Sequence, residues 1–360
     1  MTNDHAAQPV DWIPKHLSDE VQQELLALTE ESTRISSMEC SEPVIRHWCE
    51  AIEDGNPLYL DDEYAKSQGF SGIVAPPTMN STLAIPYRWP QPEAGTSSNL
   101  HFRLKRLMGL PVGVVVENET EYLRFVELGD RLFLSSRLAS ITGPKTTRLG
   151  EGWFWVMEGI TRNQRDEITS ISRTTMFAYD PGGARTADED AAPEGLSQAT
   201  EDALDTGRCT HLPPDQRVFW DDVTEGDALP TLVMPITVTR CIYLASATRD
   251  FSPHHSNRDY AQQQVGARDM FLNTPFNTGI LSRFVTEWGG PASRLRKLKL
   301  AMRENICAGD DMIIDGLVAR KFEDAGDHFV DIDIQVSTQD GPKYTAGATL
   351  LLPRLSAAIS

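Results

Sequence analysis

The sequence predicts an α+β protein built from one structural unit that occurs twice along its 360 residues. Several segments alternate apolar and polar residues, which is typical of strands with one buried face, and they follow segments with helical spacing. The same order of helix, turn-rich loop and alternating strands then appears a second time. This repetition indicates a duplicated unit.

Three matching points define the repeat. A helix leads into Asp54-x-Asn-Pro-x-Tyr59 in the first half, and a helix at 240–247 leads into Asp250-x-Ser-Pro-x-His255 in the second. Two further pairs of segments match in the same order: basic runs at 103–106 and 294–299, and Gly-Asp pairs at 129–130 and 309–310.

The individual elements follow from local patterns. Residues 43–52 read as a helix with Pro43 in its first turn. A short amphipathic helix is expected before Ser37, with one apolar face formed by Leu17, Val21, Leu25 and Leu28. Period-two alternation predicts strands at 101–106, 112–116, 132–138, 151–159, 173–179, 312–319, 328–337 and 343–352.

These patterns divide the chain into four segments. The stretch from Asp180 to Gln216 is rich in Pro, Gly, Ala and acidic residues, which is typical of an exposed connector. We therefore expect a helical extension at 1–37, a first domain at 38–180, an acidic connector at 181–216 and a second domain at 217–360.

The stretch 243–285 carries the candidate chemistry. Pro253 takes the Asp250–His255 loop out of helical geometry, and Pro275 with Thr278-Gly279 opens an apolar helical run at 280–288. A carboxylate, an imidazole and a glycine-opened helix can supply an acid, a base and an anion site. Asp-x-Ser-Pro is also a common turn sequence, and Gly279 also suits close packing.

Composition excludes several classes of function. The formal net charge of −19 argues against a nucleic-acid or anionic-membrane surface, because both need dense Lys and Arg. No apolar run approaches membrane-spanning length, and the polar N-terminus is no signal peptide. Five scattered cysteines suggest neither disulfides nor a zinc site, and they fit a reducing cytoplasm. We expect a cytoplasmic protein without a cofactor.

The repeat and the loop resemble the MaoC-like dehydratase, or (R)-specific enoyl-CoA hydratase, family. The family's loop is a small residue followed by Asp-x-Asn-Pro-apolar-His, which matches here at Asp250, Pro253 and His255. The first half, with GNPLYLDDEYAK and GIVAPPT, resembles the family's N-terminal dehydratase-like domain. Together the two resemblances cover nearly all of the chain from about Glu42.

The resemblance implies a double hot-dog fold. Each half would be a curved antiparallel sheet wrapped around one long helix, and the two sheets would join into one of about twelve strands. In the first half Tyr59 stands at the histidine position, so that half would be structural or acyl-binding. The second half would be catalytic.

The second loop departs from the family's pattern at three positions. Ser252 replaces Asn, His254 stands where an apolar residue is usual, and Arg249 stands where Gly or another small residue is usual. The resemblance implies that Asp250 and His255 hold the catalytic water, with His255 as base. Asp250 would orient the water or, if neighbours such as Phe251 desolvate it, donate the proton to C2. Ser252 would bond the loop or the water, and the Gly279 amide would bind the oxyanion.

Basic residues after the helix are candidates for coenzyme A binding. Either they form a solvated strand edge, or they hold the phosphates of the substrate's coenzyme A. The candidates are Arg294, Arg296, Lys297 and Lys299, with Arg103 in the first half.

The sequence therefore predicts an acyl-CoA hydratase or dehydratase acting on a trans-2-enoyl thioester. Its expected catalytic residues are Asp250, His255, Ser252 and Gly279, and coenzyme A enters only as part of the substrate. A hot-dog acyl-CoA thioesterase and a non-catalytic acyl-thioester-binding subunit remain alternatives. We expect a homodimer, with neither nucleic-acid nor membrane partners.

Overall fold

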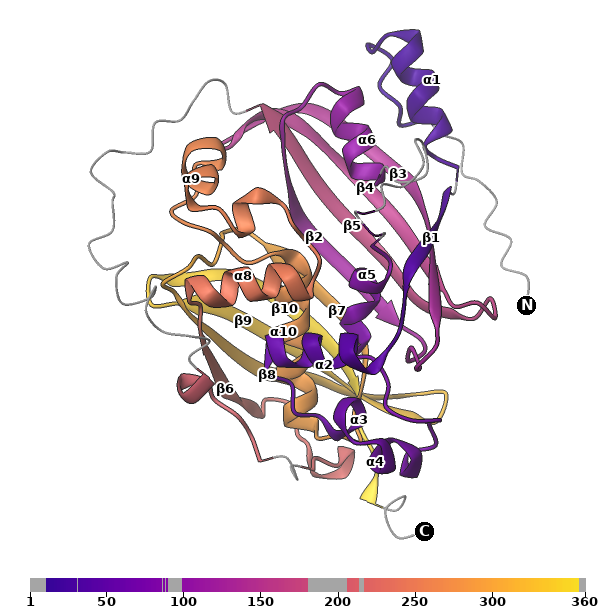
Figure 1. The fold of residues 1–360 in the computed structure, drawn as a ribbon, viewed down its shortest axis with the longest axis vertical. Coiled ribbons are helices and arrows are strands. Elements are labelled where there is room, and N and C mark those ends of the chain that lie inside the picture. The colour runs from indigo at the N-terminus through magenta and orange to yellow at the C-terminus, as the bar shows by residue number, and fades with distance from the viewer. Residues whose placement is uncertain are drawn as a thin grey trace.

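One antiparallel sheet runs through both halves of the chain (Figure 1). The computed structural model describes residues 11–30, 32–85, 87, 89, 99–180, 206–213 and 217–355, without the side chains of 33–37 and 206. In these ranges the sheet has ten strands in the order β1-β3-β4-β5-β2-β7-β10-β9-β8-β6.

The two halves contribute equivalent strands in the same order. The first half supplies β1 (Ser32–Glu39), β2 (Val112–Tyr122), β3 (Arg131–Thr147), β4 (Gly150–Arg162) and β5 (Ile168–Asp180). The second supplies β6 (Ala228–Pro235), β7 (Arg294–Met302), β8 (Asp311–Asp324), β9 (Asp327–Thr338) and β10 (Gly341–Leu351). From either edge to the seam between β2 and β7 the order is the same, which confirms the predicted repeat and the double hot-dog arrangement.

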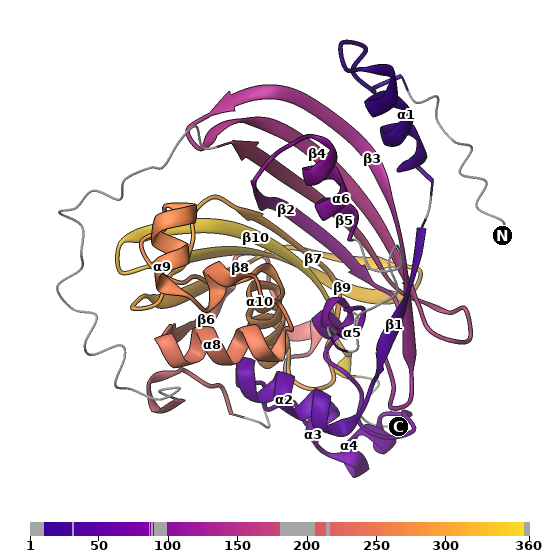
Figure 2. The same cartoon turned by 45° about the horizontal axis from the view of Figure 1, so that its top comes forward.

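Helices occupy the concave side of this sheet. In the second half the sheet curves around α10 (Thr274–Gly289), as Figure 2 shows. The other second-half helices are α8 (Val238–Ala247) and α9 (Arg258–Tyr260). The first half carries α1 (Asp19–Ala27), α2 (Glu42–Ile52), α3 (Pro57–Leu60), α4 (Asp62–Ser67), α5 (Asn80–Leu83) and α6 (Leu100–Leu107).

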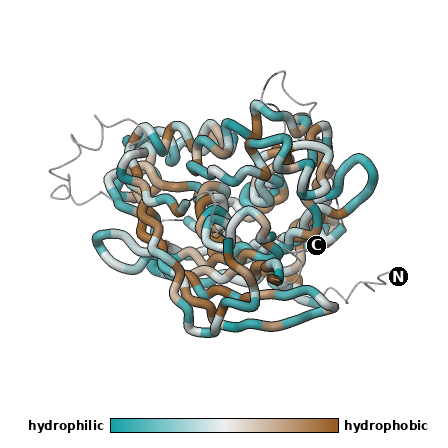
Figure 3. Tube along the Cα trace, turned by 90° about the horizontal axis from the view of Figure 1, so that it is seen from below, coloured by the Kyte–Doolittle hydropathy of each residue, from teal (hydrophilic) through white to brown (hydrophobic). Residues whose placement is uncertain are grey.

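The first half differs from the expectation of one long central helix. Its described residues place only the short α5 and α6 over the corresponding part of the sheet. In the second half, by contrast, Phe276, Ile280 and Phe284 of α10 lie in the main core against apolar strand residues. In the tube of Figure 3, the projecting loops are coloured mostly as hydrophilic.

Segment 101–106 is a helix, so its prediction as a strand was wrong. Asn99 caps α6 by accepting a hydrogen bond from the His101 amide, and the four-residue spacing of Leu100 and Leu104 buries both side chains. The proposed match between 103–106 and 294–299 fails with it. The strand equivalent to β7 is β2.

Two of the predicted boundaries also need correction. The extension was expected to end at 37, but that position falls within β1; α1 itself is confirmed, and Leu25 and Leu28 are buried. Most of the connector lies outside the described residues, at 181–205 and 214–216. Its described part, 206–213, joins the second half, since the Thr210 amide donates to the Val233 carbonyl of β6. None of the described helices is long and apolar enough to cross a membrane.

Candidate active site

The loop that carries Asp250 begins with an unusual backbone conformation. Helix α8 ends at Thr248, and Arg249 then adopts the left-handed region with φ of 56°. Its counterpart in the first half, Glu53, has φ of 55°. This conformation is reached most easily by glycine, which explains why a small residue suits the position before the aspartate.

His255 is buried and held in one orientation. Its Nδ1 donates to the Phe271 carbonyl at 2.7 Å, because a carbonyl oxygen can only accept. The backbone of Phe271 is in turn held by an isolated antiparallel β-bridge to Cys307. The other ring nitrogen, Nε2, lies 3.5 Å from Oδ2 of Asp250. The imidazole therefore presents Nε2 to the carboxylate and to whatever binds beside it.

Asp250 is held as a carboxylate. Its Oδ1 accepts hydrogen bonds from the Ser252 amide at 3.2 Å and the Ser252 hydroxyl at 2.8 Å. Burial by itself raises the pKa of the Asp250 carboxyl, but the hydrogen bond from His255 and its charge when protonated, together with the bonds from Ser252, outweigh burial and lower that pKa to about 2.

This electrostatic balance corrects one detail of the expected chemistry. As a proton donor, one of its two suggested roles, Asp250 would need desolvation by neighbours such as Phe251, yet Phe251 is 43% exposed. With a pKa of about 2, Asp250 is ionised at neutral pH and is a hydrogen-bond acceptor. Asp250 therefore holds no proton to donate at the start of the reaction, and the Asp250–His255 pair can deliver a proton only after accepting one.

An open cavity of about 2410 Å³ reaches the pair. Asp250, Ser252 and His255 line one side of it, and the first-half sheet lines another. His254 also lines it and stacks on Phe271, with ring centroids 4.9 Å apart. Burial and the neighbouring His255 lower the pKa of His254 to about 4, so this second imidazole is neutral.

Gly279 does not open the helix, contrary to the sequence-based prediction. Helix α10 begins at Thr274, which places Gly279 in its second turn. A Cβ at this position would lie 3.1 Å from both Ile52 and the Trp48 ring of α2. Gly279 therefore allows close packing of α10 against the first half, and it is not among the cavity-lining residues.

The helix terminus beside the pair is instead at Thr274. Pro275 has no N–H, the Phe276 amide binds Oδ1 of Asn273, and the Asn277 amide binds the Asn273 carbonyl. Among the described residues, the Thr274 amide is thus the one N–H of the first turn that retains its bonding capacity. The sequence Asn273-Thr-Pro, a cap followed by proline, is the signal that marks this start.

The basic residues expected to bind coenzyme A are not gathered at this cavity. Lys297 binds Glu119 at 2.7 Å and Lys299 binds Glu117 at 3.1 Å, across the seam between β7 and β2. Arg294 lies over the Phe125 ring.

Neither these three residues nor Arg296 line the cavity, whereas Arg103 on α6 does. Three other basic residues line it and have no carboxylate partner in the described part of the chain: Lys105, Arg148 and Arg303. Lys105 belongs to the basic run 103–106 that the sequence shows, whereas Arg148 and Arg303 were missed because they come from segments far from it in the chain.

The first-half loop that corresponds to Asp250–His255 does not open onto the cavity. Asp54 accepts the Asn56 amide at 3.0 Å, as Asp250 accepts that of Ser252. Asp54 and Tyr59 are both buried, and neither lines the cavity. Burial raises the pKa of Asp54 to about 6. Asn56 caps the next turn through the Leu58 amide, a role that Ser252 does not take in the second half.

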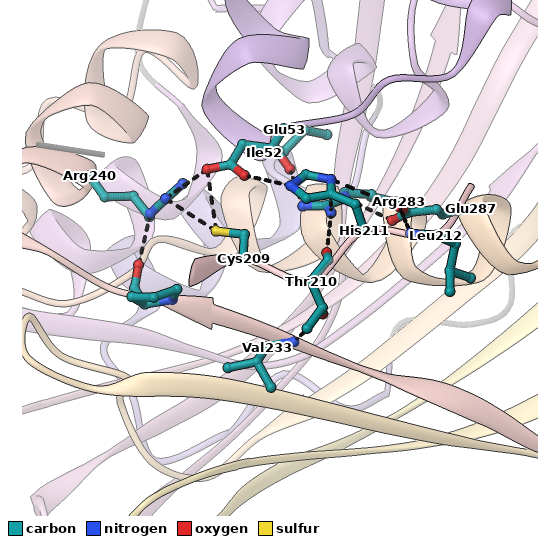
Figure 4. A network of polar contacts seen from close by, with 11 residues as sticks. Ile52, Glu53, Cys209, Thr210, His211, Leu212, Val233, Arg240, Arg283 and Glu287 are labelled. Atoms are coloured by element: carbon teal, nitrogen blue, oxygen red, sulfur yellow. Dashed lines mark hydrogen bonds and ion pairs between the residues drawn. The ribbon is translucent and has the colours of Figure 1, made fainter. Parts of the chain in front are cut away.

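A polar network fastens this first-half loop to the second half (Figure 4). Glu53 binds Arg240 of α8 at 2.7 Å and His211 at 3.1 Å. Arg283 of α10 donates to Nδ1 of His211 and to the Ile52 carbonyl. Since a guanidinium only donates, Nδ1 of His211 accepts and Nε2 donates to Glu53. The network is structural, and within the described ranges no His, Cys, Asp and Glu side chains cluster as a metal site.

Comparisons with known proteins agree with this architecture. The family model of the FAS1-like dehydratase domain region matches residues 28–170. A solved MaoC-like dehydratase superposes with a TM-score of 0.67 at 18% identity, covering 91% of this chain and 98% of its own. A conserved Mycobacterium tuberculosis protein with a double hot-dog fold gives a TM-score of 0.60 at 12% identity, covering 91% and 97%.

Two relatives are subunits of one Mycobacterium tuberculosis enzyme, 3-oxo-4,17-pregnadiene-20-carboxyl-CoA hydratase. The alpha subunit is 29% identical over 197 residues, which are 53% of this chain and 58% of the subunit. The beta subunit is 32% identical over 126 residues, which are 32% of this chain and 96% of the subunit. This chain belongs to the MaoC-like dehydratase family.

This MaoC-like chain spans 58% of the length of the alpha subunit that it matches. It also matches nearly the whole beta subunit, so segments similar to both subunits occur in one polypeptide. Its two halves share one sheet across the seam between β2 and β7, where five residue pairs connect the strands from Glu117–Ala301 to Glu121–Lys297.

Proposed function

We propose that this protein adds water across, or removes it to form, the double bond of a trans-2-enoyl-CoA thioester. The observation that carries the proposal is the 3.5 Å approach of His255 Nε2 to Asp250 Oδ2 in the wall of an open cavity. A carboxylate and an oriented imidazole at this separation can both hydrogen-bond to one water molecule that lies beside them.

The geometry supports the following steps. The water oxygen bonds to C3 of the enoyl group while His255 and ionised Asp250 accept one of its protons. The electron pair of the double bond moves toward the thioester carbonyl, and the pair then returns a proton to C2. The product is a 3-hydroxyacyl-CoA, and the elements of one water molecule have been added.

Charge on the thioester oxygen needs a donor during this reaction. In place of Gly279, the Thr274 amide at the start of α10 is suited to it, because its N–H is outside the helical bonding pattern. The partial positive charge of the helix N-terminus favours an anion at the same place. Asp250 and His255 from one loop, and Thr274 from the start of α10, thus have separate roles.

Coenzyme A is proposed to bind along the cavity rim. Arg148 Nη2 donates to the Arg303 carbonyl at 3.1 Å, which brings two exposed arginines from different halves together. Guanidinium groups suit phosphate, and this strongly acidic chain leaves both without a carboxylate partner in the described ranges. Arg103 and Lys105 line the same cavity.

The acyl group is proposed to be large. The cavity volume of about 2410 Å³ exceeds what a short enoyl chain fills, and the described first-half helices leave part of the sheet uncovered. The two subunits named above belong to a hydratase of 3-oxo-4,17-pregnadiene-20-carboxyl-CoA, whose acyl group contains rings, and this supports a ring-bearing substrate here. Since both halves occur in one chain, one copy is proposed to contain a complete site, and a homodimer would then contain two.

Loss of absorbance at the enoyl-thioester band tests the assignment, with short, long and ring-bearing enoyl-CoA substrates. Asp250→Asn and His255→Ala are each expected to reduce turnover by at least a hundredfold, without a change in thermal midpoint beyond a few degrees. Free thiol release from saturated acyl-CoA would instead indicate a thioesterase. Unaltered hydration by both variants would exclude this pair.

A further inference from the structure

The concave face of the sheet changes character at the seam between the two halves. On β2, Asn118 lies opposite Leu300 of β7, and Thr120 lies opposite Leu298. Leu298 and Leu300 belong to the apolar core, whereas Asn118 and Thr120 line the cavity. Directly paired residues face the same side of a sheet, so at these positions one surface passes from apolar side chains on β7 to polar side chains on β2.

The polar surface extends across the neighbouring first-half strands. Asn118 pairs with Thr174 of β5 and Thr120 pairs with Ser172, while Gly159 of β4 pairs with both Ser172 and Ser136 of β3. We call the set of Asn118, Thr120, Ser136, Ser172 and Thr174 the polar floor. All five line the cavity that contains Asp250 and His255.

The floor retains hydrogen-bonding capacity. Asn118 Nδ2 donates to the Thr174 hydroxyl at 2.9 Å, which leaves the Thr174 proton and the second Asn118 N–H for other acceptors. The Ser172 hydroxyl donates to the Gly159 carbonyl over a long 3.4 Å. All three side chains are partly accessible in the described structure.

A purely hydrocarbon acyl group fits this surface poorly. Covering hydroxyl and amide groups without giving them partners weakens binding, because each group loses its hydrogen bonds to water. An oxygen-bearing acyl group avoids this cost, because it replaces the lost water contacts. The corresponding second-half positions show the alternative, since there Ile332, Ile334 and Ala348 are buried in the apolar core.

From this contrast we infer that the polar floor binds an oxygen function, a ketone or a hydroxyl, on the acyl group of the substrate. The inference rests on the proposed function in that it places the acyl group in the cavity beside Asp250. It makes Asn118 and Thr174 specificity-determining residues that do not take part in the chemistry.

Binding of saturated acyl-CoA thioesters tests the inference without turnover. The probes are a ring-bearing acyl-CoA with a ring ketone and its analogue with a methylene group at that carbon, with Kd measured by calorimetry. The wild-type protein is expected to bind the ketone about tenfold more tightly. In Thr174→Val and Asn118→Leu, this preference is expected to fall below threefold, while affinity for the methylene analogue stays the same or increases.

Thr175→Val is the matched control, because Thr175 follows Thr174 on the opposite face of β5 and does not line the cavity. It should keep the full preference. A wild-type preference below twofold, or an equal loss of affinity for both probes in the floor variants, would overturn the inference. Failure of enoyl-CoA hydration would refute the proposed function, yet it would leave these dissociation constants unaffected.

Discussion

Nδ1 of His255 donates to the carbonyl oxygen of Phe271, 2.7 Å away, and this bond decides which nitrogen can act on a substrate. Because Nδ1 carries the proton, Nε2 is the position that exchanges protons with the Asp250 side. Phe271 and His255 are separated by a loop and short helices, so the segment leading into α10 orients the base.

Replacing Thr274 with proline tests the proposed oxyanion donor. Proline is tolerated at the first position of a helix, and Asn273 has the extended backbone that a residue before proline prefers. Thr274→Pro should therefore fold normally but lower kcat for hydration by roughly a hundredfold or more, because one N–H donor is lost. Thr274→Ala keeps the N–H and should retain most activity. Equal activity in the two variants would assign the oxyanion to another donor.

Gly279→Val is expected to destabilise the protein through packing. The new side chain would meet Trp48 and Ile52, both buried, and overpacking of this kind costs about 1–3 kcal/mol. Chemical denaturation should show this loss, while kcat per folded molecule stays within a few fold of the wild type. A hundredfold fall in kcat with unchanged stability would restore the catalytic role that the sequence suggested.

Asp54→Asn is expected to stabilise the protein at neutral pH. Burial raises the pKa of Asp54 from 3.8 to about 6, so the folded state binds more protons than the unfolded state between these values. Stability therefore falls as pH rises from about 4 to about 6 and remains lower above it.

The neutral amide removes this penalty, which amounts to about 3 kcal/mol at pH 7. Urea unfolding of both proteins at pH 4 and pH 7 measures the difference. A variant that gains nothing at pH 7 would show that Asp54 is not held in a protonation-sensitive environment.

Arg303→Gln and Arg148→Gln should weaken binding of the coenzyme A portion. Each is expected to raise KM for an enoyl-CoA about tenfold and to leave kcat nearly constant, since the change is remote from C2 and C3. An enoyl-pantetheine thioester lacks the nucleotide phosphates and serves as the comparison substrate. Its KM should be the same for the variants and the wild type. Lys299→Gln, whose side chain is paired with Glu117, is the matched control.

Much of the architecture could be predicted from the sequence. Alternation located strands β2 to β5 and β8 to β10, although the observed strands are mostly longer. The loop Asp250-x-Ser-Pro-x-His255 could be recognised because its proline and turn residues leave a clear pattern. The structure brings Asp250, Ser252 and His255 together as the motif suggested.

Other features could not be predicted because they depend on packing or on which face a side chain occupies. Alternation within β7 directs Lys297 and Lys299 away from the face that buries Leu298, so nearness in sequence to α10 was misleading. The short segment 101–106 fits both periods, and the Asn99 cap with the packing of His101 and Lys105 over Gly113 favours a helix. Asn273 and Pro275 mark the start of α10 in the sequence, but the apolar run at 280–288 suggested a later start.

The seam between β2 and β7 has a consequence for how this protein can change over evolutionary time. Two halves made as one polypeptide are always produced in equal amounts, and each half always has its partner half in the same chain. If the proposed Asp250–His255 pair carries the chemistry, the first half, with Tyr59 at the histidine position, need supply neither a second pair nor a contact to its own copy. Its inner surface can then change to suit a particular acyl group.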